Sequence, residues 1–220
     1  MYITLILLGI IMATVIGWIL RQTLNVQPWV SEAADNAVSG ASLDADTKTV
    51  GLTTFLAVAT SIFALFISAY TLRMDEPDWR PLTEPNLLWF NTALLVLASI
   101  AYHWTRNAAI GGLTEKLKPG LAISGLLTIM FLGGQLIAWQ ELMAGGYYVS
   151  YNPANAFFYL LTAVHGIHLL GGLWVWARST IKVWTGAEAD SVRLSIELCT
   201  VYWHFLLLVW IVLFGMLLST

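Results

Sequence analysis

Four ionisable side chains lie inside two of the most apolar stretches of the sequence. His165 and His168 are in the middle of FFYLLTAVHGIHLLGGLWVW, and Glu197 and His204 are in IELCTVYWHFLLLVWIVLF. An ionisable residue is costly inside a membrane, so it usually faces another helix, a lipid headgroup or a water-filled cavity. These residues are therefore the first indication of what the protein contacts.

The spacing of these residues would allow them to meet. His165 and His168 are three residues apart, which places them on one face of a helix. Glu197 and His204 are seven residues apart, close to two helical turns, and also share a face. A short connection between the two segments would make them neighbours, and the four side chains could then converge.

Three interpretations of these four residues stay open. Histidine and glutamate are ligands for iron or zinc, but the whole chain has only four histidines, fewer than a membrane di-iron enzyme needs. A haem between helices usually needs histidines paired across them. A polar network or a lipid-headgroup site between helices is favoured, and the third interpretation is helix–helix hydrogen bonding without a ligand.

The elements that carry these residues are predicted to be membrane-spanning helices. Of the 220 residues, 58% are hydrophobic and 10% are charged, which leaves too little polar surface for a soluble domain of this size. The predicted fold class is all-α, a polytopic transmembrane helix bundle that forms a single domain over residues 1–220. The net charge of −3 argues against nucleic acid as a partner.

The sequence predicts six membrane spans. Each is an apolar segment of about 20 residues, the length that crosses a bilayer, and Gly, Pro or charged residues separate them. The longest polar stretch, residues 22–50, is predicted to be an irregular loop. The six predicted spans cover residues 2–20, 51–72, 86–105, 121–143, 154–177 and 196–218.

Lys and Arg are distributed unequally between the two sides of these spans. Because cytoplasmic loops carry an excess of basic residues, we expect both termini to lie outside, on the periplasmic side of a bacterial plasma membrane. Eight basic residues fall on the predicted inner side, namely Arg21, Lys48, Arg106, Lys116, Lys118, Arg178, Lys182 and Arg193, and two on the outer side, Arg73 and Arg80.

His103 and Arg106 lie where the third predicted span reaches the inner surface. Trp104 stands between them, and Trp is typical of the interfacial region of a membrane. A histidine and an arginine at this depth could contact a lipid phosphate together. The sequence has no P-loop, no HExxH and no GxSxG, so it carries no motif of a nucleotide-binding protein, a zinc peptidase or a serine hydrolase.

Several of these stretches, in order and at similar spacing, resemble subunit III of the haem–copper oxidases, the cytochrome c and quinol oxidases. The resemblance runs from about residue 51 to residue 218. It is carried by AVHGIHLLGG, by Glu197 followed by Tyr202-Trp203-His204-Phe205 and Val209-Trp210, by Leu88 to Asn91-Thr92, and by Gln135 and Glu141.

The resemblance implies an accessory role in aerobic respiration. A subunit III carries no haem and no copper, which belong to partner subunits. It packs against subunit I, in a complex with subunit II and small subunits, binds phospholipid, and supports proton uptake and the stability of subunit I. By this resemblance His165, His168, Glu197, His204 and Arg178 line or brace lipid-contacting surfaces.

The chain also departs from the family pattern. Ala59, Thr60 and Ser61 occupy a region where many members carry a buried carboxylate, so a proton-related role of that group is not expected here. Residues 206–208 are leucines where many members have an acidic residue. The seven-helix members have two helices before the matching region, whereas this chain has one predicted span, residues 2–20.

Two functions of other classes stay open. A small transporter would need broken helices or polar stripes through several spans, whereas the polar groups here are mainly in the last two. A stand-alone membrane metalloprotein would use His165, His168 and His204. Neither the electron donor nor membership in a respiratory supercomplex follows from the sequence, although the loop 22–50 is a candidate docking element.

Overall fold

The computed structural model describes residues 47–82 and 85–219 of the chain. This part is helical, and it contains no strand. All five described helices are long and apolar enough to cross a membrane. The predicted all-α fold class is confirmed for the described residues. The helices are α2 (Thr47–Arg73), α3 (Leu87–Ile110), α4 (Thr114–Ala144), α5 (Pro153–Trp184) and α6 (Ala189–Leu218).

Five of the six predicted spans thus have a helix in the described part of the chain. The sixth prediction, residues 2–20, lies outside the described residues, as does most of the predicted loop 22–50. The C-terminal boundary of that loop was wrong, because α2 already begins at Thr47. The segment TKTV continues the helix because it contains neither Gly nor Pro.

The helices also extend beyond the apolar windows that predicted them. α4 begins at Thr114 and α6 at Ala189, whereas the predicted spans begin at 121 and 196. α4 even includes Pro119, which the sequence suggested as a break. Pro119 is the sixth residue of α4, so its missing N–H removes one backbone hydrogen bond near the start of the helix, and the helix continues through it. Hydropathy therefore located the apolar centre of each helix and missed its polar ends.

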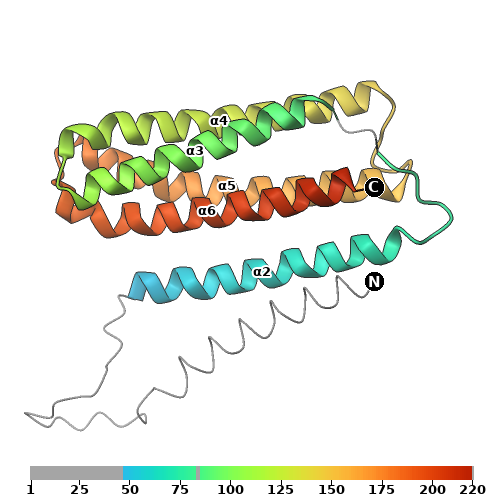
Figure 1. Cartoon of the computed structure of the whole chain (residues 1–220), viewed down its shortest axis with the longest axis horizontal. Coiled ribbons are helices and arrows are strands. Elements are labelled where there is room, and N and C mark those ends of the chain that lie inside the picture. The colour runs from blue at the N-terminus through green and yellow to red at the C-terminus, as the bar shows by residue number, and fades with distance from the viewer. Residues whose placement is uncertain (1–46, 83–84, 220) are drawn as a thin grey trace, which may run out of the picture. The chain divides into compact units, whose positions relative to one another are not determined.

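The chain consists of two compact units, and the boundary between them lies within α2, between Ala64 and Leu65. The first unit ends at Ala64, and its described part is the helical segment 47–64. The second unit starts at Leu65 and contains the end of α2 and all of α3 to α6. Figure 1 shows α3 to α6 running side by side as a bundle, in which α3 packs against α4 and α6, and α5 packs against α4 and α6.

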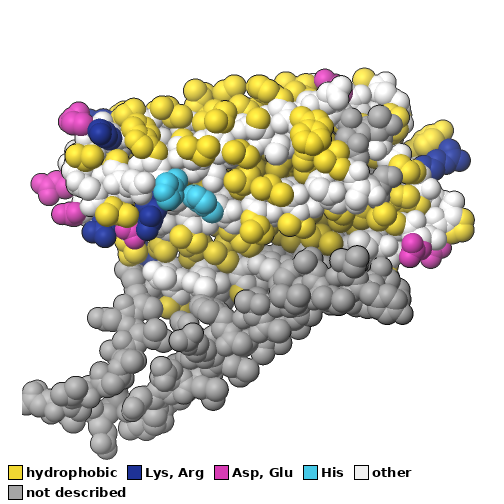
Figure 2. Space-filling model, in the orientation of Figure 1, with side chains coloured by type: hydrophobic (Ala, Val, Ile, Leu, Met, Phe, Trp, Pro, Cys, Tyr) yellow, Lys and Arg dark blue, Asp and Glu magenta, His cyan; other side chains and the backbone are white. Residues whose placement is uncertain are grey.

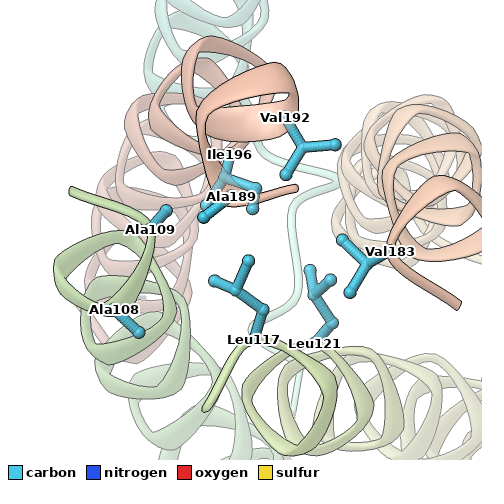
Figure 3. Packing of buried hydrophobic residues seen from close by; sticks show 8 residues of the cluster. All are labelled: Ala108, Ala109, Leu117, Leu121, Val183, Ala189, Val192 and Ile196. Atoms are coloured by element: carbon cyan, nitrogen blue, oxygen red, sulfur yellow. The ribbon is translucent and has the colours of Figure 1, made fainter. Parts of the chain in front are cut away.

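One end of this bundle is closed by small and branched aliphatic side chains. Figure 3 shows them pointing from all four helices into a common space, where van der Waals packing stabilises the contact between the helices. The alanines of α3 keep that helix close to its neighbours. The cluster consists of Ala108, Ala109, Leu117, Leu121, Val183, Ala189, Val192 and Ile196.

The glycines of α4 and α5 are of two kinds, which differ in what an added side chain would meet. At Gly172 an added Cβ would lie 2.7 Å from Cε1 of Tyr202, and at Gly134 it would overlap the side chain of Asn91. At Gly133 and Gly171 the same Cβ would meet nothing within 4 Å. Gly134 and Gly172 therefore serve helix packing, and the other two face outward.

At the opposite end of the bundle, where α5 begins, Asn152 makes several hydrogen bonds. Its side chain accepts hydrogen bonds from the backbone N–H of Ala154 (3.1 Å) and of Arg80 (3.3 Å), and it donates to the Arg80 carbonyl. The first contact caps α5, and Pro153 occupies the first helical position, as the sequence suggested. The contacts with Arg80 hold the loop after α2 against the start of α5.

Candidate functional site

His165 lies in the centre of the bundle. It is 1% exposed, and its Nε2 is 3.1 Å from the backbone carbonyl oxygen of Leu206 in α6. Because a carbonyl can only accept a hydrogen bond, Nε2 carries the proton and donates it. The imidazole ring also lies 5.2 Å from the ring of Trp210 and 5.8 Å, edge to face, from the ring of Phe131.

These contacts tie all four helices of the bundle together at one level. Trp210 of α6 donates from Nε1 to the hydroxyl of Thr92 in α3 at 2.9 Å, and its ring meets that of Phe131 in α4 at 5.0 Å. His165 of α5 completes the group. We call His165, Trp210, Phe131 and Thr92 the His165 core.

A second buried polar contact lies between α3 and α4. The side-chain amide of Asn91, which is fully buried, donates to Oε1 of Gln135 at 3.5 Å. The sequence had singled out Gln135 as a polar position within a span and Asn91 as part of a motif. It did not pair them, because they come from different helices and are 44 residues apart.

His204 lies in a different setting, on the outside of the bundle. It is exposed, and its Nδ1 is 2.6 Å from the backbone carbonyl oxygen of Thr200. Its ring lies 5.9 Å from that of His103 in α3, which is also exposed. Figure 2 shows histidine side chains together on the surface over α3 and α6. We call these two residues the His103–His204 pair.

Glu197 is held by its own helix. Its Oε1 accepts a hydrogen bond from Nε of Arg193, one turn earlier, at 2.9 Å. This partner was not predicted, although the i, i+4 spacing of an arginine and a glutamate could have indicated it. Exposure of 48% and 27% for the two side chains makes this a partly solvated ion pair of small energetic value.

His168 is half-buried on α5, and its Nδ1 is 2.8 Å from the carbonyl oxygen of Val164. Its own carbonyl accepts a hydrogen bond from the hydroxyl of Tyr202 at 2.8 Å. The four residues, whose spacing would have allowed them to converge, have different surroundings: His165 is in the core, His204 is on the surface and Glu197 is paired with Arg193. One face of α6 turns inward and another outward, and the sequence did not show which residues lie on each.

The remaining predicted residues lie on the surface of α3 and α5. Arg178 is exposed, and its guanidinium stacks 5.2 Å from the ring centre of Trp174. Arg106 is half-buried. Among the described residues, the ion pairs to carboxylates are Arg73–Asp78 and Arg193–Glu197, so neither Arg106 nor Arg178 is neutralised by a carboxylate in this part of the chain.

The donor atoms do not fit a metal centre built from three or more side chains. No group of three or more His, Cys, Asp or Glu side chains in the described residues lies close enough together to hold an ion. One ring nitrogen of each of His165, His168 and His204 lies within hydrogen-bond distance of a backbone carbonyl oxygen. In the described bundle each of these three histidines therefore has one ring nitrogen engaged by the backbone.

Comparison with known proteins assigns this architecture to a family. The sequence profile described as "Cytochrome c oxidase subunit III" matches residues 47–218, a range that begins with α2 and ends with α6. The chain belongs to the cytochrome c oxidase subunit III family. The resemblance carried by its histidine and tryptophan motifs is thereby confirmed.

Individual relatives agree with this membership. The chain is 32% identical to a probable cytochrome c oxidase subunit 3 of Mycobacterium leprae, over 75% of this chain and 84% of the relative. It is 29% identical to cytochrome c oxidase subunit 3 of Synechocystis, over 77% and 74% of the two chains. It is 25% identical to cytochrome bo(3) ubiquinol oxidase subunit 3 of Pseudomonas aeruginosa, over 70% and 74%.

The structure gives a physical role to the motifs that the chain shares with the subunit III family. In AVHGIHLLGG, His165 bonds to α6 and Gly172 makes room for Tyr202. In the YWHF stretch, Trp203 stacks on Tyr102 with ring centres 4.7 Å apart, while His204 points outward. These motifs therefore combine core packing residues with exposed ones.

Proposed function

We propose that this chain is the non-catalytic subunit III of a haem–copper terminal oxidase in aerobic respiration. The observation that carries the proposal is the family match over all five described helices, residues 47–218. Relatives from cytochrome c oxidases and from a ubiquinol oxidase are similar to the chain. Either electron donor is therefore compatible with the proposal.

In this proposal the haems and copper belong to the partner subunits. The interior of the bundle supports this division of roles. Among its buried polar side chains, His165 bonds to the Leu206 carbonyl and Asn91 bonds to Gln135. The chain then contributes a rigid membrane surface against which subunit I packs, within a complex that also contains subunit II and small subunits.

The surface also supports binding of phospholipid. Neither Arg106 nor Arg178, which stacks on Trp174, has a carboxylate partner in the described part of the chain. A lipid phosphate would supply the negative charge that these two arginines lack. His103 and His204 are exposed on α3 and α6 and could extend such a contact when protonated. The side chain of His165 braces the bundle through its bond to α6, whereas those of His168 and Glu197 bond within their own helices.

The distribution of basic residues supports insertion into a bacterial plasma membrane. The connections after α3 and α5 include or adjoin Lys116, Lys118, Lys182 and Arg193, and positive loops favour the cytoplasmic side. In this orientation the C-terminal end of α6 faces the periplasm. If residues 2–20 form a further span, the N-terminus lies on the same side.

Gentle purification of the full chain from its native membrane, with a reduced-minus-oxidised absorption spectrum, tests the proposal. We expect haem a or haem o bands together with larger partner subunits on a gel. The chain separated from these partners should be colourless. A partnerless, colourless preparation from a membrane that retains an active haem–copper oxidase would contradict the proposal and favour a transport function.

A further inference from the structure

The two rings of the His103–His204 pair lie at a separation that a shared metal ion would permit. The two ring centres are 5.9 Å apart, and the ring planes are inclined by 67°. A zinc–imidazole bond is about 2 Å long and each ring centre lies about 1 Å behind its nitrogen, so two imidazoles on one ion have centres about 5 Å apart at the tetrahedral angle and about 6 Å apart at most. The observed separation is at the upper end of this range. We propose that His103 and His204 form a binding site for a divalent transition-metal ion, of which zinc is the best example.

The hydrogen bond of His204 prepares it for this role. Its Nδ1 lies 2.6 Å from the Thr200 carbonyl oxygen, which can only accept a hydrogen bond, so Nδ1 carries the proton in the neutral ring. The lone pair is then on Nε2, the nitrogen on the other side of the ring. Histidines that bind metals commonly donate their second nitrogen to a carbonyl in this way, which fixes the tautomer and the ring orientation.

The backbone beneath the pair is held in register by the residues directly before each histidine. Tyr102 and Trp203 stack with ring centres 4.7 Å apart and planes inclined by only 15°. The hydroxyl of Thr200 also lies 3.3 Å from the Tyr102 carbonyl. The two Cα positions are therefore fixed before any ion arrives, and preorganised ligands lose less entropy on binding.

The chemistry of the surroundings defines the class of ion. Imidazole ligands suit zinc, copper and nickel, whereas magnesium and calcium prefer oxygen ligands. The carboxylate of Glu197 is engaged by Arg193, so a third protein ligand is not provided, and water would complete the coordination. An ion bound by only two histidines exchanges with the solution, so it is not a resident cofactor. When bound, it would link α3 to α6.

This inference goes beyond the proposed subunit function and does not depend on it. A lipid phosphate would require the pair in its cationic form, whereas a metal ion requires neutral imidazoles. The two ligands therefore use different protonation states of the same residues, and zinc binding can be measured separately from retained phospholipid.

The test uses the full chain, purified in detergent through an affinity tag without histidine and freed of metal by a chelator. Equilibrium dialysis against zinc, with elemental analysis, gives the number of ions bound. We expect close to one zinc ion per wild-type chain. His103→Gln and His204→Gln should each weaken binding by at least about tenfold, whereas the control His168→Gln should bind like the wild type.

A second readout keeps the proposal falsifiable if a variant folds poorly. Copper(II) bound to the wild-type chain should show an electron paramagnetic resonance spectrum with hyperfine coupling to two imidazole nitrogens. Coupling to one nitrogen or none would overturn the proposal. Zinc binding that persists in His103→Gln or His204→Gln would also overturn it, as would a loss of retained phospholipid in these variants while zinc binding is unchanged.

Discussion

His165 and His204 come from motifs in adjacent helices, yet they lie in opposite environments. His165 is buried among aromatic rings and bonds to the backbone of another helix, α6. His204 is exposed and bonds to the backbone of its own helix. The same residue type therefore stabilises the interior of the bundle in one place and lies exposed on its surface in another.

The difference follows from what each hydrogen bond joins. The bond from His165 to Leu206 crosses between α5 and α6, so breaking it leaves a buried carbonyl with one partner fewer and a void between helices. The bond from His204 to Thr200 stays within one turn of α6 and fixes only the side chain. The structural consequence of substitution should therefore differ strongly between the two sites.

Replacement of His165 by alanine should give the largest loss of stability. It removes a ring packed against Phe131 and Trp210 and a buried hydrogen bond, which together are worth about 3 kcal/mol. Thermal unfolding in detergent, followed by circular dichroism, measures the effect. An unchanged melting temperature would show that the core closes around the missing ring and would remove the contrast with His204.

Replacement of Gly172 by alanine should give the next largest effect. The new Cβ would lie 2.7 Å from the Tyr202 ring and would force α5 and α6 apart, at a cost of about 1 to 3 kcal/mol. Gly171→Ala is the matched control, because nothing lies within 4 Å of its Cβ position. Equal melting temperatures for the two variants would contradict the assigned helix contact.

Replacement of His204 by alanine should change the stability of the metal-free chain little. An exposed side chain that bonds only within its own helix contributes less than about 0.5 kcal/mol. The same melting experiment measures it beside His165→Ala. A loss as large as that of His165→Ala would place His204 in the core and refute the assignment of the pair to the surface.

The smallest effect is expected at the exposed loop after α2. The hydrogen bond from the Arg73 guanidinium lowers the pKa of the Asp78 carboxyl below its ordinary value of 3.8. A lowered pKa in the folded state means that the contact stabilises above pH 3.8 and is lost as the pH falls through the lowered value. Because the pair is exposed, the contribution is slight.

Comparison of the wild type with Asp78→Asn at neutral pH and near pH 3 isolates this contribution. The two melting temperatures should differ slightly at neutral pH and approach each other in acid. A difference that grows in acid would show that the sign is wrong and that Asp78 has another partner at low pH.

Much of the fold could be predicted from the sequence because apolar length determines a membrane helix. The centres of α2 to α6 followed from hydropathy, and Pro153 correctly marked the start of α5. The polar ends were missed, as at Thr114, because a helix can continue into the headgroup region without an apolar signal. For the site, the sequence allowed Glu197 and the histidines to converge, but it could not show that Glu197 bonds to Arg193. Their lipid-contacting role stays a prediction.

The sequence by itself determined which residues share a helix face and which family the chain resembles. Periodicity relates His165 to His168, and Glu197 to His204, because helical geometry is local. Only the tertiary structure decided that His165 turns inward to Leu206, that His103 meets His204, and that Asn91 meets Gln135. These pairings depend on the rotation and depth at which helices distant in sequence pack, and the packing of side chains between helices fixes both.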